Sequence, residues 1–301
     1  MPAPQLGPIV QACICAPDLD RTVAAWCGSL EHRQAGEDRV GAEEAQLWNQ
    51  PGLAGARRTR LANALDEAWL EIIENTEAAV VNPFDHGGWF SLEINVQNVD
   101  ELRTRIDESA FKVIGEPTNL DVSDDIRAMQ LLGPAGEVLY LTEIKAEVPP
   151  FELPFARCAV DRLFIPVMLA SSRDAAISIY ERLNGTSSFK FDTKITVINR
   201  ARGRPLETRY PVAALQFGGS HLIEIDQLDG ITPRSPAECS MPAGIVMISF
   251  LTPQLPEKLD TYIIAHGPLA GRRAARMQGT EGEWIELIET KERSPNTKAI
   301  N

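Results

Sequence analysis

An eight-residue pattern near the start of the chain returns near its end. Residues 67–74 read EAWLEIIE and residues 282–289 read GEWIELIE, so a carboxylate stands in the middle of an aliphatic run in both. Two weaker copies lie between them, GEVLYLTE at 136–143 and SHLIEIDQ at 220–227. Four copies of one strand-length segment indicate a chain of 301 residues built from four repeat units.

Each copy is preceded by an apolar strand and then by a helix with recognisable end signals. The N-caps of the first three helices are expected at Asp18, Asn98 and Ser171 or Ser172. Gly185 is expected to end the third helix, and the fourth should run from near Pro256 to Gly267. Each unit is therefore predicted to be a strand, a helix and two or three further strands, the last of which carries the repeated octet.

The spacing of the units groups them in pairs. From the helix cap to the central position of the octet is 53 residues in unit one (18 to 71) and 52 in unit three (172 to 224). The same interval is 42 residues in unit two (98 to 140) and about 33 in unit four (253 to 286). This alternation indicates a two-unit domain that was duplicated whole.

A prolyl segment separates the two pairs of units. The stretch AEVPPFELPFA at 146–156 holds three prolines, which stiffen an extended connection and do not suit a central strand. We therefore predict two domains, residues 1–147 and residues 157–301, joined by a linker over 148–156.

Composition and charge exclude several classes of function. The chain is 44% hydrophobic and 24% charged, which is typical of a soluble globular protein. Its 29 basic against 42 acidic residues give a net charge of −13, which disfavours binding to nucleic acid. No apolar run has the length of a membrane span, and the N-terminus lacks the basic and long apolar regions of a secretory signal. The five cysteines lack the spacing of a zinc site or a redox motif, so we expect reduced thiols in a cytoplasmic protein.

Four stretches together resemble one known superfamily. They are VQACICAPDLDRTVAAW, SLEINVQNVDEL, GPAGEVLYL and GTEGEWIELIE. With four βαβββ units in two pairs, the chain resembles the vicinal oxygen chelate superfamily, which includes glyoxalase I, bleomycin and fosfomycin resistance proteins, extradiol dioxygenases and methylmalonyl-CoA epimerase. The last two stretches are similar to the closing Gly-x-x-x-Glu-Leu hairpin of that family, although Tyr140 stands where Glu is usual. The resemblance covers essentially the whole chain and implies an α+β fold of two glyoxalase-like domains, each a curved mixed sheet around a cleft.

The resemblance also implies positions for a divalent metal, held by His or Gln on first strands and by Glu on closing strands. The matching positions are Gln11, Glu71, Ser91 and Tyr140 in the first domain and Ile165, Glu224, Val246 and Glu286 in the second. Ser and Tyr are poor ligands for such a site, and Ile and Val are none. None of the four histidines stands at a first-strand position. We therefore expect no cofactor, with a divalent metal on this incomplete set as the alternative.

Alternation along the strands divides each octet between two faces. The aliphatic residues should pack under the helices while the central Glu lines the cleft. In the first domain the predicted cleft-facing residues are Gln11, Cys13, Cys15, Trp69, Glu71, Ser91, Glu93, Asn95 and Tyr140. Burial beside Trp69 and Cys13 should raise the pKa of Glu71, which suits a general base. Tyr140 is placed to donate a hydrogen bond to a developing enolate oxygen.

In the second domain, Glu224 and Glu286 are expected to face each other across the cleft, with Trp284 beside them. Two facing carboxyl groups can share a proton, which is an acid–base arrangement. The structural alternative is that they pair with Arg162 or Arg204.

Two basic stretches, RRTR at 57–60 and GRRAAR at 271–276, are predicted to be solvent-facing strand edges. The alternative is that they grip an anionic substrate.

The sequence thus predicts a metal-independent lyase or isomerase that abstracts a proton next to the carbonyl of a small apolar or aromatic compound. The predicted catalytic residues are Glu71, Tyr140, Glu224 and Glu286, and the predicted substrate-binding residues are Gln11, Cys13, Trp69, Ser91, Glu93 and Trp284. Two alternatives stay open: an extradiol-type dioxygenase with degenerate metal ligands, and a protein that sequesters a hydrophobic small molecule without chemistry. A monomer and a homodimer are both compatible with the repeat, and no nucleic acid or membrane partner is expected.

Overall fold

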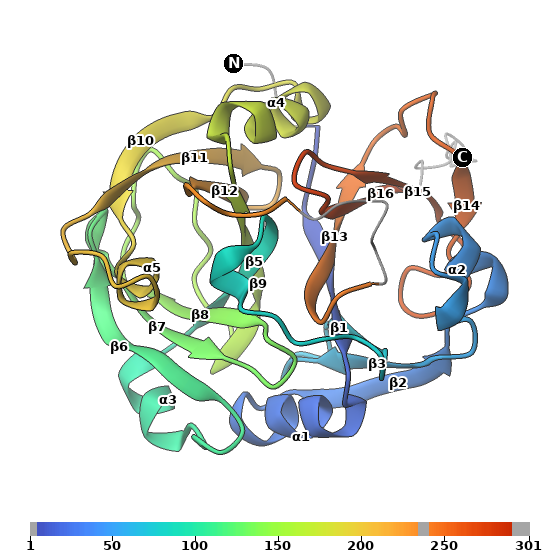
Figure 1. The fold of residues 1–301 in the computed structure, drawn as a ribbon, viewed down its shortest axis with the longest axis horizontal. Coiled ribbons are helices and arrows are strands. Elements are labelled where there is room, and N and C mark those ends of the chain that lie inside the picture. The colour runs from blue at the N-terminus through green and yellow to red at the C-terminus, as the bar shows by residue number, and fades with distance from the viewer. Residues whose placement is uncertain (1–4, 234–240, 291–301) are drawn as a thin grey trace, which may run out of the picture.

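The computed structural model describes residues 5–233 and 241–290, and within them the strands form two eight-stranded sheets (Figure 1). The first sheet has the strand order β14-β15-β16-β13-β1-β4-β3-β2. Unit one contributes β1 (Ile9–Ala16), α1 (Leu19–Ser29), β2 (Arg33–Arg39), α2 (Ala42–Leu47), β3 (Arg57–Ala62) and β4 (Ala68–Glu74). Unit four contributes β13 (Gly244–Thr252), β14 (Thr261–Ile263), β15 (Arg273–Gln278) and β16 (Trp284–Glu289).

The second sheet has the order β10-β11-β12-β9-β5-β8-β7-β6. Unit two contributes β5 (Gly88–Val96), α3 (Val99–Arg105), β6 (Lys112–Leu120), β7 (Ser123–Leu132) and β8 (Val138–Ile144). Unit three contributes β9 (Val160–Ala170), α4 (Arg173–Asn184), β10 (Phe189–Lys194), α5 (Thr196–Ala201), β11 (Arg209–Phe217) and β12 (His221–Gln227). Short 3-10 turns occupy Pro51–Leu53 and Pro83–Asp85. Two curved mixed sheets made from four repeat units confirm the predicted fold class.

The units that share a sheet are not the ones expected. Unit one pairs with unit four through antiparallel β1 and β13, and unit two pairs with unit three through antiparallel β5 and β9. The prediction that neighbours along the chain build each cleft is therefore wrong. An internal repeat identifies equivalent strands, but it does not say which first strands pair edge to edge. The domain boundaries at 1–147, 148–156 and 157–301 stay a prediction.

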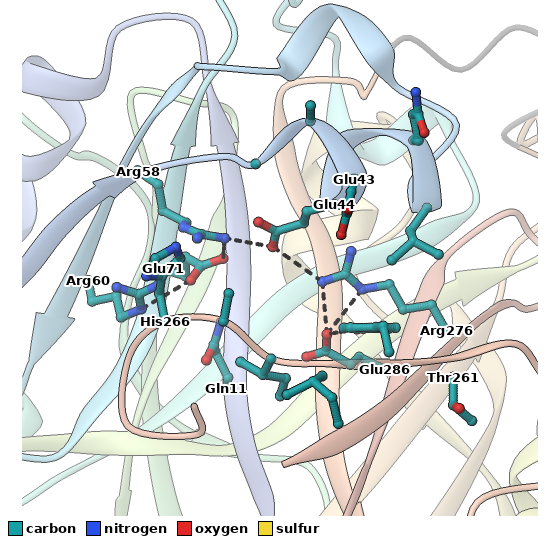
Figure 2. Close-up of a pocket in the computed structure, with 18 residues that line it drawn as sticks. Gln11, Glu43, Glu44, Arg58, Arg60, Glu71, Thr261, His266, Arg276 and Glu286 are labelled. Carbon is teal, nitrogen blue, oxygen red and sulfur yellow. Dashed lines mark hydrogen bonds and ion pairs between the residues drawn. The ribbon is translucent and has the colours of Figure 1, made fainter. Parts of the chain in front are cut away.

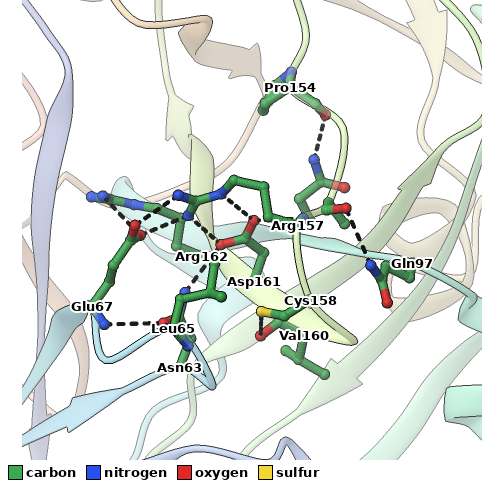
Figure 3. Close-up of polar contacts among 12 residues, drawn as sticks. Asn63, Leu65, Glu67, Gln97, Pro154, Arg157, Cys158, Val160, Asp161 and Arg162 are labelled. Atoms are coloured by element: carbon green, nitrogen blue, oxygen red, sulfur yellow. Dashed lines mark hydrogen bonds and ion pairs between the residues drawn. The ribbon is translucent and has the colours of Figure 1, made fainter.

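The prolyl linker is docked on the second sheet (Figure 3). The Asn95 amide on β5 donates a hydrogen bond to the carbonyl oxygen of Pro154. Just after the linker, Arg157 donates to both carboxylate oxygens of Glu67, at 2.7 and 2.6 Å, and to Asp161 at 2.8 Å. Glu67 belongs to the turn before β4, so this bidentate contact fixes the start of β9 against the first sheet.

The predicted caps of the first three helices are present. Asp18, Asn98 and Ser172 each accept a hydrogen bond from the backbone N–H three residues further on, at 2.9, 2.9 and 3.4 Å. Gly185 ends α4 with a φ of 72°, a left-handed conformation that favours glycine.

The fourth predicted helix does not form. After β13 the chain makes a turn in which the Leu259 N–H donates to the carbonyl oxygen of Pro256, and it then enters the short strand β14. Pro253 and Pro256 remove two backbone donors, and Thr261, Ile263 and Ile264 are β-branched. These residues favour extended chain over helix.

The extra length of units one and three contains a short helix that the sequence analysis did not predict. α2 lies between β2 and β3, and α5 lies between β10 and β11. Residues of each helix line the cavity above the corresponding sheet. The long spacing of units one and three is therefore explained in part by a segment that covers a cavity.

One apolar core joins the two sheets. It includes Trp26 of α1, Leu92 of β5, Tyr180 of α4 and Phe250 of β13, each of which is almost fully buried. The ring centroids of Tyr180 and Phe250 lie 6.4 Å apart across the boundary between units three and four. None of the described helices is long and apolar enough to cross a membrane. Packing between the sheets therefore leaves the opposite face of each sheet to form its own cavity.

Candidate functional site

A cavity lies over the open face of each sheet. The first-sheet cavity has a volume of about 890 Å³ and is lined by Gln11, Glu71 and Glu286 among others (Figure 2). The second-sheet cavity has a volume of about 790 Å³ and is lined by Glu93, Tyr140 and Glu224 among others. The predicted site residues are therefore gathered into two groups, but not into the predicted ones. Glu224 and Glu286 lie on different sheets and do not face each other, and neither do Glu71 and Tyr140.

The floors of the two cavities are built from equivalent positions. The register of β1 and β13 sets Gln11 opposite Ser249, and the register of β9 and β5 sets Ile165 opposite Glu93. The closing strands are paired equivalently in the two sheets. Ser249 lies beside Glu286 in the first sheet, and Glu93 lies beside Tyr140 in the second. The equivalent pairs, first sheet then second, are Gln11 and Ile165, Glu71 and Glu224, Ser249 and Glu93, and Glu286 and Tyr140.

In the first-sheet cavity, Glu286 is held by three neighbours. Arg276 donates to its Oε1 from Nη2 at 2.9 Å and from Nε at 3.0 Å, and Ser249 Oγ donates to its Oε2 at 2.5 Å. The hydroxyl of Tyr262 donates to Oε1 as well. Burial acts to raise the pKa of Glu286, but the charge of Arg276 and these hydrogen bonds outweigh it and hold the pKa below its ordinary value. Glu286 is thus an ionised carboxylate.

Glu71 is also paired with arginine. Its Oε2 lies 3.3 Å from Nε of Arg60, and its Oε1 lies 3.7 Å from Nη1 of Arg58. Burial raises the pKa of Glu71, the direction expected from the sequence, and the two guanidinium groups oppose that rise. Its expected neighbour Cys13 stands beside it on β1, and burial raises the pKa of that thiol well above its ordinary value.

A second layer of contacts fixes the arginines. Arg58 donates to Asp38 at 2.6 Å and to Glu44 of α2 at 2.7 Å, and Arg60 donates to Asp38 at 2.7 Å. Arg276 lies between two aromatic rings, 4.4 Å from the centroid of Trp48 and 4.9 Å from that of Tyr262. The cationic groups of this cavity are therefore held on several sides.

These arginines correct in part the prediction that the two basic stretches face solvent, which holds for Arg57 and Arg273 but not for Arg58, Arg60 and Arg276. Arg60 stands opposite Glu71 in the β3–β4 pairing, and Arg276 stands opposite Glu286 in the β15–β16 pairing. Arg58 and Arg276 are among the most buried charged side chains of the site, with 4% and 7% of the side chain exposed. The signal in the sequence was the spacing of Arg58 and Arg60, which puts both on one face of a strand.

The second-sheet cavity has the same floor without the arginines. Ala214 stands opposite Glu224 where Arg60 stands opposite Glu71, and Gln130 stands opposite Tyr140 where Arg276 stands opposite Glu286. Within residues 5–233 and 241–290, no Lys, Arg or His forms an ion pair with Glu93, Glu224 or the neighbouring Asp226. Glu93 and Asp226 are therefore buried, and Glu224 is half-buried, without a compensating charge.

Burial without compensation changes the protonation of this cluster. Desolvation raises the pKa of Glu224 to about 7, and a hydrogen bond from Asp226 opposes that rise. Burial and the nearby Glu224 raise the pKa values of Glu93 and Asp226 well above their ordinary range. Three carboxyl groups that cannot all ionise must share protons. Asp226, which the sequence analysis missed, carries a proton and donates it in a hydrogen bond to Glu224.

Tyr140 completes the floor. Burial, and then the charges of Asp226, Glu93 and Glu224, raise the pKa of its hydroxyl well above the ordinary value. The hydroxyl is therefore protonated at neutral pH and can donate a hydrogen bond into the cavity.

The remaining predicted residues are placed as follows. Ser91 is fully buried on β5, and its hydroxyl has no hydrogen-bond partner in the described part of the chain. Trp284 packs in a small apolar cluster with Cys13 and Trp48, beside the first-sheet cavity.

The prediction that Trp69 lines a cleft is wrong. Its ring packs against Trp26 of α1, with centroids 6.0 Å apart, in the core on the other face of the sheet. Leu61 pairs with Leu70 and Ala62 with Ala68, so Trp69 is the extra residue of a β-bulge. A bulge interrupts the alternation of faces on which the prediction depended.

Comparison with solved structures identifies the fold. Glyoxalase I from Zea mays superposes with a TM-score of 0.60 at 16% identity, over 94% of this chain and 93% of that chain. A dioxygenase candidate from Bacillus subtilis superposes with a TM-score of 0.61 at 10% identity, over 96% of this chain and 86% of that chain. The chain has the fold of the vicinal oxygen chelate superfamily. The sequence matches no protein-family model and no curated protein.

The vicinal oxygen chelate fold implies a divalent cation held by two residues of first strands and two of closing strands. In the first-sheet cavity these positions hold Gln11, Glu71, Ser249 and Glu286. Both carboxylates are already ion-paired with guanidinium groups. A cation placed between them would lie beside the positive charges of Arg60 and Arg276. Among the residues that the structure describes, no group of three His, Cys, Asp or Glu side chains is arranged to hold a metal ion. The residues present therefore do not fit a divalent metal.

Two of the ligand positions inferred from the sequence are also displaced, and in unit two Glu93, rather than the predicted Ser91, stands opposite Ile165 and beside Tyr140. Val246 belongs to an apolar cluster, and Ser249 occupies the position equivalent to Glu93. The inference counted back from a helix cap in unit four, and that helix does not form.

Proposed function

We propose that the second-sheet cavity is the active site of a metal-independent isomerase or lyase that acts on a small carbonyl compound. The observation that carries the proposal is Glu224, a half-buried carboxyl group at the cavity wall with a pKa of about 7 and no ion-pair partner among the described residues. A general base works best when its pKa lies near the operating pH. The proton-sharing neighbours Glu93 and Asp226 supply a local reservoir of protons.

Ionised Glu224 would remove the proton from the carbon next to the substrate carbonyl. The electron pair of the broken C–H bond moves onto the carbonyl oxygen, and the hydroxyl of Tyr140 donates a hydrogen bond to the resulting enolate oxygen. The enolate then collapses in one of two ways. The proton on Glu224 returns to a different carbon, which is an isomerisation, or a leaving group departs with the electron pair, which is an elimination.

The walls of the cavity support a small apolar or aromatic substrate. Val113, Ile114, Phe191, Ile195 and Val197 line it, and its volume of about 790 Å³ falls in the range typical of small-molecule sites. Arg200 of α5 also lines it, and within the described residues its guanidinium forms no ion pair. A polar substituent at the far end of the substrate would meet that group.

The first-sheet cavity supports this chemistry less well. Arg276 holds the pKa of Glu286 below its ordinary value, and Arg58 and Arg60 oppose the rise that burial causes in the pKa of Glu71. A carboxylate stabilised by a guanidinium is a weaker base.

The test is hydrogen–deuterium exchange, observed by NMR, in a panel of small aromatic and aliphatic carbonyl compounds in D₂O. Wild-type protein should catalyse exchange at the carbon next to the carbonyl in at least one of them. Glu224→Gln should lower that rate by about 10²–10⁴-fold, and Tyr140→Phe by about 10²-fold or more. Asp192→Asn is the matched control, because Asp192 lies on the same sheet with its side chain exposed to solvent.

Full exchange activity in Glu224→Gln would exclude the proposed base. A compound that binds in the cavity with no exchange, and with the same affinity in Glu224→Gln, would favour the alternative of sequestration without chemistry.

A further inference from the structure

The first-sheet cavity has a glutamate at each of the two closing-strand positions that would hold a divalent metal, although its residues together do not fit one. Glu71 and Glu286 are 4% and 3% exposed, and two such charges cannot be buried without compensation. We propose that the guanidinium groups of Arg60 and Arg276 form a built-in replacement for the divalent cation of the vicinal oxygen chelate fold.

Each glutamate of this cavity has one guanidinium group as its nearest cationic partner. Arg60 lies 3.3 Å from Glu71 and Arg276 lies 2.9 Å from Glu286, so two single positive charges face two single negative charges. Arg58 extends the network, because it lies 2.6 Å from Asp38, 2.7 Å from Glu44 and 3.7 Å from Glu71. Asp38 and Glu44 in turn pair with Arg60 at 2.7 Å and with Arg276 at 3.8 Å.

The two arginines also share one kind of position. Each stands on the strand next to a closing strand and directly opposite its glutamate, Arg60 on β3 and Arg276 on β15. Trp48 and Tyr262 hold the Arg276 guanidinium between their rings, and Figure 2 shows it bridging toward Glu44 and Glu286. The cationic groups are thus fixed by the fold, as a metal ion would be by its ligands.

The second sheet provides an internal comparison. The positions equivalent to Arg60 and Arg276 hold Ala214 and Gln130. The acidic groups of that cavity have no guanidinium partner in the described part of the chain, and they form a proton-sharing cluster instead of ion pairs. The two arginines therefore account for the difference between the ion-paired carboxylates of the first-sheet cavity and the proton-sharing carboxyl groups of the second.

Removing the two arginines should restore a metal site. In Arg60→Ala/Arg276→Ala, the groups Glu71, Glu286, Gln11 and Ser249 would face an open space, and of the guanidinium groups paired with the two glutamates only Arg58, 3.7 Å from Glu71, would remain. Arg57→Ala/Arg273→Ala is the matched control, because these arginines lie on the same two strands with 32% and 51% of the side chain exposed. Chelator-treated full-length proteins would be titrated with MnCl₂ by isothermal calorimetry.

The double variant should bind one Mn²⁺ at least about tenfold more tightly than wild type or the control, and Glu286→Gln added to it should remove the gain. Equal affinity in wild type and the double variant would overturn the proposal, and so would tight binding of one Mn²⁺ by wild type. If the double variant folds only when Mn²⁺ is added, as seen by circular dichroism, the proposal is supported. If it folds in neither condition, Arg276→Ala alone decides: tighter Mn²⁺ binding than wild type supports replacement of the metal, and unchanged binding contradicts it.

Discussion

Arg60 and Ala214 occupy the same position in the two sheets, each opposite the glutamate of a closing strand. Arg60 faces Glu71 on β4, and Ala214 faces Glu224 on β12. The first glutamate is ion-paired, and the second is half-buried and has no cationic partner among the described residues, so that desolvation raises its pKa to about 7. The same fold thus contains ion-paired carboxylates in the first-sheet cavity and carboxyl groups that share protons in the second-sheet cavity.

The rate of exchange should depend on pH through Glu224. Its pKa is raised from the ordinary 4.5 to about 7, and only the ionised form can accept a proton. We expect kcat/KM to rise as the pH rises through about 7 and then to level off. The measurement is the exchange rate of a responsive carbonyl compound from pH 5 to 9. A rate that is already at its plateau at pH 5 would contradict the assignment.

Introducing the missing guanidinium should shift that profile. Gln130 lines the second-sheet cavity at the position equivalent to Arg276, and Gln130→Arg would place a positive charge beside the carboxyl cluster. A nearby opposite charge lowers a carboxyl pKa by about 1–3 units, so the midpoint of the pH profile should move down by that amount. Gln130→Met, which has no charge, should leave the midpoint near 7. An equal shift in both variants would show that the effect is not electrostatic.

A buried glutamate at the sheet boundary should affect stability in a pH-dependent way. Burial raises the pKa of Glu283 to about 7, and the hydroxyl of Tyr180 on α4 donates to it at 3.0 Å. Its contribution to stability is present below about pH 4.5 and is lost as the pH rises through about 7, because the unfolded chain releases the proton first. Glu283→Gln cannot ionise and should therefore gain stability relative to wild type over that range, by roughly 3 kcal/mol at most.

Urea denaturation of wild type and Glu283→Gln at pH 5 and pH 8 measures this difference. A constant difference between the two proteins at both pH values would show that Glu283 does not titrate in this range. Comparing the variant with wild type at each pH cancels the contributions of other buried groups, such as His32, whose pKa burial lowers to about 4.

The core that joins the sheets should depend strongly on Trp26. This side chain is fully buried, packs edge to face with Trp69 and Phe111, and donates from Nε1 to Glu137 at 3.1 Å. Trp26→Ala should lower the free energy of unfolding by about 3–5 kcal/mol, as removal of a large buried aromatic generally does. Chemical denaturation checks this, and a loss below about 1 kcal/mol would mean that the site is not part of a closely packed core.

The repeat units and the fold could be predicted from the sequence because their signals are local. The octet that ends in Glu74 and its copies have strand periodicity, and Asp18, Asn98 and Ser172 are caps that act within one turn of helix. The pairing of units could not be predicted in this way. It depends on which first strands meet at their edges, and all four are short apolar strands with similar patterns.

The site was predicted in part for the same reason. Glu71, Glu224 and Glu286 were found because they interrupt apolar runs. Arg276 was missed because its partner Glu286 is set by the register of a hairpin, and a basic stretch read alone is typical of a solvent-facing edge. Ser249 was missed because its position was counted from a helix that does not form.

The ionisation of Glu224 tests the central claim most directly. Carboxyl carbons of glutamate can be followed by ¹³C NMR as the pH is changed, with the signal assigned by its absence in Glu224→Gln. We predict a midpoint near 7 for Glu224, because the half-buried carboxyl group is desolvated and has no ion-pair partner among the described residues. A midpoint near the ordinary value of about 4.5 would contradict the account, since the second-sheet cavity would then contain no base suited to neutral pH.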